Sequence, residues 1–420
     1  MNRILRVVTM SNLPRLMAFQ ILVILCIAAY LYKRVTPSVA LTSYYVNGSR
    51  GAVDHGFWKR FGIESECRRF IRADEGGVVL DDVQAYRSNL LITHKFTEQE
   101  LDTRPFQLNI NKSDVIVVVH IQKTGGTAFE NHLVLDTIVD PPCNCTTMPG
   151  QMKRLLCTCV NDKGQDWMFN RHTTGWTCGV HSDLTETGAC VDLWFGSQVR
   201  ENRTRRYHYV TMLRDPVTRF ISEWLHVRRG ATWKEARLSC NGRDATLKEV
   251  PFCFKYGTWV NVSLSEFMNC SSNMAFNRMT RMLSNLSLVD CYRLDSKLSQ
   301  EERNEIMLQS AKDNLTKFFK FFGLVEYQEE GQLLLEKTIL GLKFKNQITS
   351  KKSSIATNYA MLSEHHWSTI VQKNLLDVRL YQFAKDLFLQ RLKKYDIKIN
   401  PRQNEALRVE RGFTYTTIGA

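Results

Sequence analysis

The pattern of apolar and polar positions along the chain predicts a parallel sheet. Residues 115–119 form an unbroken run of β-branched apolar side chains, which is typical of a strand buried on both faces. A second strand is predicted over 207–213 and a late one over 321–325. Helical patterns lie between and after these segments. We therefore expect an α/β fold with a central parallel sheet flanked by helices.

Helices are predicted where apolar residues recur at helical spacing. After the second strand, Asp215 and Pro216 are residue types that favour the N-cap and the first position of a helix. Phe220, Trp224 and Val227 then recur at i, i+4 and i+7, so this helix should pack one face inward. Further helices are expected over 98–103, 300–320, 328–343 and 364–394.

A glycine-rich turn follows the first strand. Lys123 precedes Gly125 and Gly126, and a helix is expected to begin there with Thr124 or Thr127 near its N-cap. This order of strand, turn and helix directs backbone N–H groups at an anion, so a phosphate or sulfate ester is the natural ligand. The lysine precedes the glycines, which excludes a Walker A loop. The alternative is an ordinary turn in a nucleotide or sugar-phosphate protein.

A second motif follows the second strand. Arg214 stands at the end of that strand and Ser222 lies two helical turns later. A forked cation and a hydroxyl in this arrangement suit a phosphate group. Taken alone, the pattern also fits an Arg–Asp pair that caps a helix. Both motifs follow a strand and open a helix, and their occurrence in this order favours the anion site.

The charge of the chain indicates an acidic partner. The 420 residues carry a net charge of +14, and 44% of them are hydrophobic, which suffices for a sizeable core. A basic protein of this kind binds nucleic acid, an anionic membrane or a sulfated polysaccharide, or simply has a solvated basic surface. The charge by itself does not choose among these.

The N-terminal region contains a candidate membrane segment. Residues 16–32 are apolar apart from Gln20 and span about 25 Å as a helix, at the short end for a bilayer. Basic residues precede it and favour a cytosolic N-terminus; a cleaved signal peptide is the rival interpretation. We expect a cytoplasmic tail at 1–15, a transmembrane signal-anchor at 16–32, a stem at 33–55, one lumenal domain at 56–395 and a basic tail at 396–420.

Sequons and cysteines indicate an oxidising lumen for the rest of the chain. Eleven of the twelve cysteines follow the anchor; most should pair, and the odd number leaves at least one free or bonded to another chain. A lumenal protein does not meet nucleic acid, so the positive charge then indicates an acidic glycan. The predicted glycosylation sites are Asn47, Asn111, Asn144, Asn202, Asn261, Asn269, Asn285 and Asn314.

Two cysteine-rich segments predict disulfide-braced insertions. Residues 141–160 contain two C-x-C pairs, which allow a zinc site or disulfides; the spacing and the lumenal context favour a disulfide-pinned hairpin with Lys153 and Arg154 at its tip. Residues 240–291 carry four cysteines and three sequons, which is typical of an exposed insertion.

A histidine in loop-like sequence is a candidate general base. His181 lies in the segment 171–183 with Trp176 and an acid, Asp183, close by. An aromatic side chain beside charge is common in sugar sites, and a histidine near an acid can accept a proton. Taken alone, a histidine near a cysteine is more often structural.

The string His120–Thr127, read together with Arg214 and Ser222, resembles the heparan-sulfate 6-O-sulfotransferases. Similar segments at 173–181 and 222–234 extend the resemblance over most of residues 105–395. It implies a P-loop-like sulfotransferase domain that transfers a sulfuryl group from 3′-phosphoadenosine 5′-phosphosulfate (PAPS) to the glucosamine 6-hydroxyl of heparan sulfate. It also implies a single-pass type II protein of the Golgi membrane with a lumenal catalytic domain.

The resemblance assigns roles to individual residues. His181 and Lys123 are the expected catalytic residues, with His181 as the base for the 6-hydroxyl. The expected PAPS contacts are His120, Ile121, Gln122, Lys123, Thr124, Gly125, Gly126, Thr127, Arg214, Ser222, Thr349, Ser350, Lys351, Ile355 and Ala356. The expected acceptor contacts are Lys153, Arg154, Arg171, Trp176, His181, His226 and Arg229. Ile355 departs from the family pattern, which has arginine there, and Lys351 or Lys352 is the candidate substitute.

Two other functions fit the same sequence. One is a sulfotransferase that acts on another position or glycan, and the other is a non-catalytic glycan-binding Golgi protein. No metal is expected, because sulfuryl transfer by these residues requires none. A kinase is disfavoured, since neither a Walker A loop nor a set of Mg²⁺ ligands is visible in the sequence. The oligomeric state does not follow from the sequence.

Overall fold

The structure is a computed structural model that describes residues 94–148, 151–198, 205–231, 238–254, 258–348 and 362–400. The predicted tail, anchor and stem, with residues 56–93 of the predicted domain, lie outside these ranges, as do residues 401–420. No helix within the described ranges combines the length and the apolar character that crossing a membrane requires.

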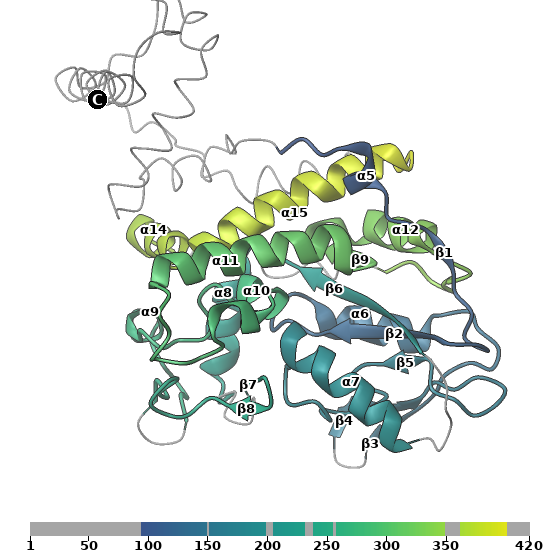
Figure 1. Ribbon diagram of the computed structural model, residues 1–420, viewed down its shortest axis with the longest axis horizontal. Coiled ribbons are helices and arrows are strands. Elements are labelled where there is room, and N and C mark those ends of the chain that lie inside the picture. The colour runs from purple at the N-terminus through teal and green to yellow at the C-terminus, as the bar shows by residue number, and fades with distance from the viewer. Residues whose placement is uncertain are drawn as a thin grey trace, which may run out of the picture. The chain divides into compact units, whose positions relative to one another are not determined.

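A four-stranded parallel sheet forms the centre of the domain, which confirms the predicted fold class (Figure 1). Its strands lie in the order β5 (Met168–Phe169), β2 (Asp114–Val119), β6 (Arg206–Leu213) and β9 (Phe321–Leu324). All six residues of β2 are buried, as expected for a strand covered on both faces. β2 pairs with β6 over its whole length, from Asp114 opposite Arg206 to Val119 opposite Thr211.

Helices surround this sheet, with α11, α12 and α15 beyond β6 and β9, and α7 on the side of β5 (Figure 1). The longer helices are α6 (Gly126–Leu135), α7 (Leu184–Gln198), α8 (Pro216–Val227), α11 (Gln300–Asp313), α12 (Gln328–Thr338), α14 (Glu364–Lys373) and α15 (Leu375–Lys394). The short ones are α5 (Glu98–Leu101), α9 (Leu264–Asn269) and α10 (Arg278–Leu283). Short strands β1 (Phe106–Gln107) and β10 (Ile339–Leu340) pair in parallel, while β7 (Ser239–Cys240) and β8 (Arg243–Asp244) form a small antiparallel pair.

The start of α8 is as predicted. The carboxylate of Asp215 accepts a hydrogen bond from the backbone N–H of Thr218 at 2.9 Å, and Pro216 occupies the first turn. Phe220 and Val227 are buried, so the inward face is also confirmed. The side chain of Asp215 thereby fixes the direction in which the chain leaves β6.

The prediction of one long helix over 364–394 is wrong. The structure has two helices, α14 and α15, which are separated at Asn374. Asn374 is buried and non-helical (φ −116°), and its amide group donates to the carbonyl oxygen of Ile370 at 2.8 Å. Its side-chain oxygen accepts from the N–H of Asn277 at 3.2 Å. An asparagine that bonds both backbones competes with the helical hydrogen bonds, and the apolar periodicity does not reveal this.

Five disulfides brace the described part of the chain. The predicted hairpin is confirmed: β3 (Asn144–Met148) and β4 (Gln151–Thr158) are antiparallel. Two disulfides, Cys143–Cys159 and Cys145–Cys157, pin it, which excludes zinc at these cysteines. The insertion at 240–291 is braced by Cys240–Cys291 and Cys253–Cys270, and Cys178–Cys190 is the fifth disulfide. Cys67 lies outside the described residues.

Truncating a buried side chain at the end of β6 should lower the stability of the protein far more than truncating an exposed one. Leu213 is 0% exposed, whereas Leu193 on α7 is 74% exposed. We expect Leu213→Ala to lower the free energy of unfolding by about 2–5 kcal/mol, because it removes buried methyl groups and leaves a cavity. The matched variant Leu193→Ala should change it by less than about 0.5 kcal/mol. Urea denaturation of both variants measures this, and similar losses would contradict the burial of Leu213.

Candidate active site

The turn between β2 and α6 has the geometry of an anion site. Lys123 and Gly125 both have positive φ, at 66° and 76°. The prediction that a threonine caps α6 is wrong: the N-cap is Gly125, and no side chain among the described residues caps it. Thr124 donates its hydroxyl to the carbonyl oxygen of Ile121 at 3.0 Å, and Thr127 is exposed in the first turn. The first N–H groups of α6 are therefore available to an anion.

The position of this turn in the sheet agrees with an anion site. The chain passes from β2 to β5 on one side of β2, and later to β6 on the other side. Ligands of open α/β sheets bind where the strand order reverses in this way, outside the carboxyl ends of the strands. The turn of residues 120–125 leaves β2 at that end, next to the end of β6.

A buried carboxylate holds the side chain of His120 against the turn. Glu130 on α6 is fully buried, and its Oε2 lies 2.7 Å from His120 Nδ1 and 3.1 Å from Arg171 Nε. Burial by itself raises the pKa of Glu130, but His120, Arg171 and His172 together hold that pKa below its ordinary value. Arg171, an expected acceptor contact, is thus engaged with this buried carboxylate.

His181 contacts this turn. Its Nδ1 is 3.3 Å from the carbonyl oxygen of His120, and its ring centroid is 4.6 Å from that of Trp176 and 5.0 Å from that of His120. A carbonyl oxygen only accepts, so in the neutral ring this contact places the proton on Nδ1 and leaves Nε2 unprotonated. The backbone of His181 is in the left-handed region (φ 57°), which is uncommon for a histidine.

The surroundings of His181 favour its neutral form. Burial, the positive charge of His120 when protonated and that of Arg278 hold the pKa of His181 well below its ordinary value. A neutral imidazole with an unprotonated Nε2 can accept a proton near neutral pH.

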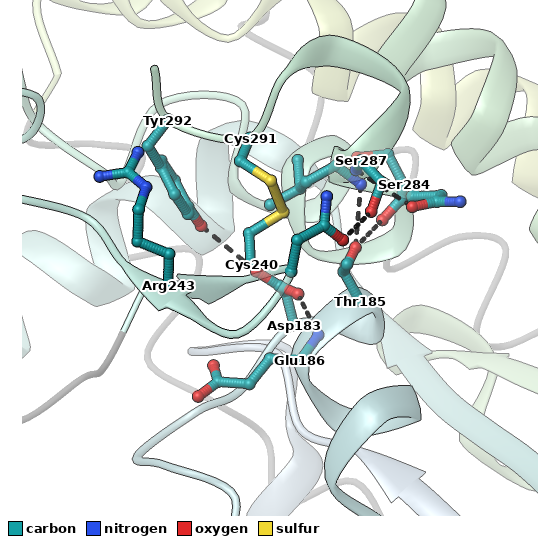
Figure 2. The surroundings of a disulfide bond; sticks show 12 residues. Asp183, Thr185, Glu186, Cys240, Arg243, Ser284, Ser287, Cys291 and Tyr292 are labelled. Carbon is teal, nitrogen blue, oxygen red and sulfur yellow. Dashed lines mark hydrogen bonds between the residues drawn. A yellow bond between two sulfur atoms is a disulfide. The ribbon is translucent and has the colours of Figure 1, made fainter.

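Asp183 does not orient His181, contrary to the expectation from the sequence. Its carboxylate accepts from the N–H of Glu186 at 2.9 Å at the start of α7, and from the hydroxyl of Tyr292 at 3.2 Å (Figure 2). Burial raises the pKa of this carboxyl group. Asp183 thus connects the segment after His181 to the insertion, next to the Cys240–Cys291 disulfide (Figure 2). Proximity in sequence suggested the wrong partner.

The two sequence motifs meet at the ends of β2 and β6. Arg214 donates from Nη1 to the carbonyl oxygen of Lys123 at 3.2 Å. Burial and the charges of Arg214 and Arg229 lower the pKa of Lys123. His226, in the last turn of α8, is near enough to Lys123 and Arg229 for burial and both charges to lower its pKa. Ser222 is half-buried on the same helix.

Several residues near His181 were missed by the reasoning from sequence. Glu223 on α8 is buried. Its carboxylate accepts hydrogen bonds from Arg219 Nη1 at 2.5 Å and from Arg278 Nε at 2.9 Å. A cavity of about 290 Å³ has Gln122, His181, Glu223, Arg278 and Arg281 in its walls. The i, i+3 spacing of Arg278 and Arg281 on α10 was a signal for a basic face. Nothing in the sequence places that face beside His181.

Other expected site residues have different positions. Ile121 is buried in the core, so only its backbone can contact a ligand. Lys153 and Arg154 lie within β4, so the prediction that they stand at the tip of the hairpin is wrong: Met148 already pairs with Gln151. Their side chains are outside what the structure describes. The third expected PAPS segment also lies outside the described residues, namely Thr349, Ser350, Lys351, Ile355 and Ala356. Among the described residues there is no group of three or more His, Cys, Asp or Glu side chains placed to hold a metal ion.

The sequons differ in accessibility. Asn314 is half-buried in a π-helical turn, and its side-chain amide donates to the carbonyl oxygen of Leu283 at 2.8 Å. This amide is therefore poorly placed to carry a glycan. Asn47 and Asn202 lie outside the described residues. The exposed sequons are Asn111, Asn144, Asn261, Asn269 and Asn285.

A parallel sheet with an uncapped helix N-terminus and a cluster of cations at its carboxyl edge defines a protein that binds phosphate or sulfate esters. Comparison with known proteins specifies the class. Residues 106–384 match the sulfotransferase family. The chain is 47% identical over 313 residues to heparan-sulfate 6-O-sulfotransferase 3-B of Danio rerio, covering 74% of this chain and 72% of the relative.

Further relatives carry the same family name. Heparan-sulfate 6-O-sulfotransferase 3 of Homo sapiens is 47% identical over 293 residues, which are 69% of this chain and 60% of the relative. Heparan-sulfate 6-O-sulfotransferase 2 of Gallus gallus is 46% identical over 291 residues, 69% of this chain and 70% of the relative. The chain belongs to the sulfotransferase family and, within it, to the heparan-sulfate 6-O-sulfotransferases, as the resemblance indicated.

The first glycine of α6 should not tolerate a side chain. A Cβ at Gly126 would lie 2.9 Å from the His120 ring, which Glu130 holds in place. We expect Gly126→Ala to lower the free energy of unfolding by about 1–3 kcal/mol through overpacking. Gly188 on α7 has open space around its Cβ position, so Gly188→Ala should be neutral or stabilising by up to about 1 kcal/mol. Denaturant titration of both variants measures these changes. A Gly126→Ala protein as stable as wild type would contradict the close contact between residue 126 and the His120 ring.

Proposed function

We propose that the chain transfers a sulfuryl group from PAPS to the 6-hydroxyl of glucosamine residues in heparan sulfate. The observation that carries the proposal is the position of His181. An imidazole with an unprotonated Nε2 is bonded to the backbone of the anion-binding turn that also contains Lys123. The names of the relatives support both the reaction and the acceptor.

The residues of the site have complementary roles in this reaction. His181 Nε2 takes the proton of the 6-hydroxyl as its oxygen forms a bond to sulfur. The bond between sulfur and the bridging phosphate oxygen breaks, and the N–H groups of α6 and Lys123 stabilise the charge that this oxygen acquires. Adenosine 3′,5′-bisphosphate leaves, with its 3′-phosphate bound by Arg214 and Ser222 until release.

The basic surface near His181 suits a polyanionic acceptor. Arg214 and Arg229 are both close enough to Lys123 for their charges to lower its pKa. Trp176 presents an aromatic ring beside His181, which is a suitable surface for a sugar. A cleft of positive charge raises the rate of encounter with a sulfated chain, in a way that falls with ionic strength. The proposed location is the Golgi lumen, with the segment at 16–32 as the anchor.

Two alternative functions predict different experimental results. A sulfotransferase for another acceptor would use the same PAPS residues and label another position. A glycan-binding protein without chemistry would not need adenosine 3′,5′-bisphosphate, and the intact turn at 120–127 together with Arg214 argues against it.

Transfer of labelled sulfate tests the proposal, with PAPS, desulfated heparosan-type chains and disaccharide analysis of the product. We expect label at glucosamine O6. His181→Ala should abolish turnover, with a loss of at least about 10²-fold, because it removes the general base. The variant should still bind adenosine 3′,5′-bisphosphate, which calorimetry measures. Activity near that of wild type would contradict the role of His181, and label at another position would contradict the acceptor.

The pH dependence of turnover should report the environment of His181. The pKa of His181 lies below its ordinary value, so its base form persists at lower pH than for a free histidine. We expect the acidic limb of kcat/KM to lie below about pH 6.5, with activity falling as the pH drops through the lowered pKa. Asp183→Asn serves as the control and should leave this limb in place, since Asp183 bonds Glu186 and Tyr292. A limb at or above pH 6.5 would contradict the assignment.

A further inference from the structure

The segment that follows β9 meets both candidate anion motifs. β9 pairs in parallel with β6, and the last residues of the two strands lie opposite each other. The next segment, Val325–Tyr327, therefore leaves β9 at the edge where Arg214 follows β6. It also abuts the glycine turn, because a Cβ at Gly125 would lie 2.9 Å from Cγ2 of Val325. The proposed mechanism gives this segment no role.

Glu326 in this segment bonds the backbone of the second motif. Its Oε1 accepts a hydrogen bond from the N–H of Asp215 at 2.8 Å. That N–H belongs to the peptide group that joins Arg214 to Asp215. Because a peptide group is planar, the bond fixes the orientation of the backbone from which the Arg214 side chain projects.

Tyr381 on α15 holds the other oxygen of the same carboxylate. Its hydroxyl donates to Glu326 Oε2 at 2.8 Å. Both partners are buried, since Tyr381 is 1% exposed and Asp215 is 6% exposed. Each carboxylate oxygen thus has a donor on a fixed element, which gives the side chain of Glu326 one orientation. Hydrogen bonds that are shielded from water in this way are costly to lose.

Arg214 needs an accurately placed backbone. Its Nη1 donates to the carbonyl oxygen of Lys123 at 3.2 Å, so its side chain reaches from the end of β6 to the glycine turn. If the backbone of Arg214 moved, the guanidinium group would have to give up this bond or its position for the phosphate. A forked, charge-assisted contact loses most of its strength when it is misaligned.

The length of the Glu326 side chain matters more than its charge. Burial and the carboxylate of Asp215 raise the pKa of Glu326, against the opposing effects of its two hydrogen bonds and of Arg214. The surroundings therefore do not favour a charged group here. A side-chain amide of the same length can accept from Asp215 and donate to the oxygen of Tyr381. What the position requires is an acceptor that reaches the N–H of Asp215.

We propose that Glu326 is a positioning residue for the binding of a nucleotide that carries a 3′-phosphate. It holds the peptide that follows Arg214, and Tyr381 in turn holds Glu326. Glu326 itself does not contact the nucleotide. The inference rests on the proposed function, because that function assigns the 3′-phosphate to Arg214.

Two substitutions of Glu326 separate reach from charge. Glu326→Asp keeps the carboxylate but is one methylene shorter, and Glu326→Gln keeps the length without the charge. We expect Glu326→Asp to raise the Kd for adenosine 3′,5′-bisphosphate and the KM for PAPS at least about fivefold, because the bond to Asp215 is lost. Glu326→Gln should keep both within about twofold of wild type. The KM for the acceptor should not change in either variant. Calorimetry and initial rates measure these values.

Two controls separate positioning from a general loss of structure. Asp114 is a buried carboxylate at the opposite end of β2, 2.9 Å from both Arg206 Nε and His208 Nε2. Asp114→Asn should lower the stability of the protein but leave the Kd for adenosine 3′,5′-bisphosphate unchanged. Adenosine 5′-monophosphate lacks the 3′-phosphate, so it should bind wild type and Glu326→Asp with affinities within about twofold of each other.

Three results would overturn the inference. One is a Kd for adenosine 3′,5′-bisphosphate in Glu326→Asp equal to that of wild type. Another is a loss of affinity in Glu326→Gln as large as in Glu326→Asp. The third is an equal loss of affinity for adenosine 5′-monophosphate. Should Glu326→Asp fail to fold, Tyr381→Phe replaces it and should weaken binding of the bisphosphate alone.

The proposed function and the inference fail in different ways. If wild type binds adenosine 3′,5′-bisphosphate but labels a position other than O6, the proposed acceptor is wrong. The binding of the bisphosphate to wild type and the Glu326 variants then still decides about Glu326. If wild type does not bind the bisphosphate, both the proposed function and the inference are overturned.

Discussion

The parallel pairing of β2 with β6 is the constraint on which the rest of the structure depends. Because the two strands run side by side from Asp114 and Arg206 to Val119 and Thr211, their carboxyl ends meet at one edge. Lys123 and Arg214, far apart in the chain, therefore become neighbours and share a hydrogen bond. A short turn leads from each of these strands into a helix, so both candidate anion contacts are positioned by the central sheet.

Buried carboxylates then set the positions of the basic side chains. Glu130 holds His120 and Arg171, and Glu223 holds Arg219 and Arg278. A buried carboxylate without such partners would be costly, so each carboxylate keeps its cations close to it. Glu326 acts similarly on the backbone, since it accepts from the N–H of Asp215 and from Tyr381, both at 2.8 Å. The site is thus a basic surface supported by buried acids.

The insertion completes the site from outside the sheet. Its disulfides hold it in shape where it has little regular structure, and its contacts with the segment around Asp183 place it against His181. The candidate anion contacts thus come from the sheet edge, whereas the insertion provides most of the wall of the cavity.

The sequence by itself determined the elements whose signals are local: the buried run of β2, the glycine turn, the Asp215 cap of α8 and the cysteine-pinned hairpin. The order of the motifs also predicted that the ends of β2 and β6, which carry the candidate anion contacts, lie together. Tertiary structure alone decided the rest, because it depends on contacts between distant residues. Asn374 divides a helix through its bond with Asn277, Asp183 binds Tyr292 and does not orient His181, and Gln122 and Arg281 line the same cavity. Periodicity and spacing describe neighbours along the chain, whereas these pairings arise from packing.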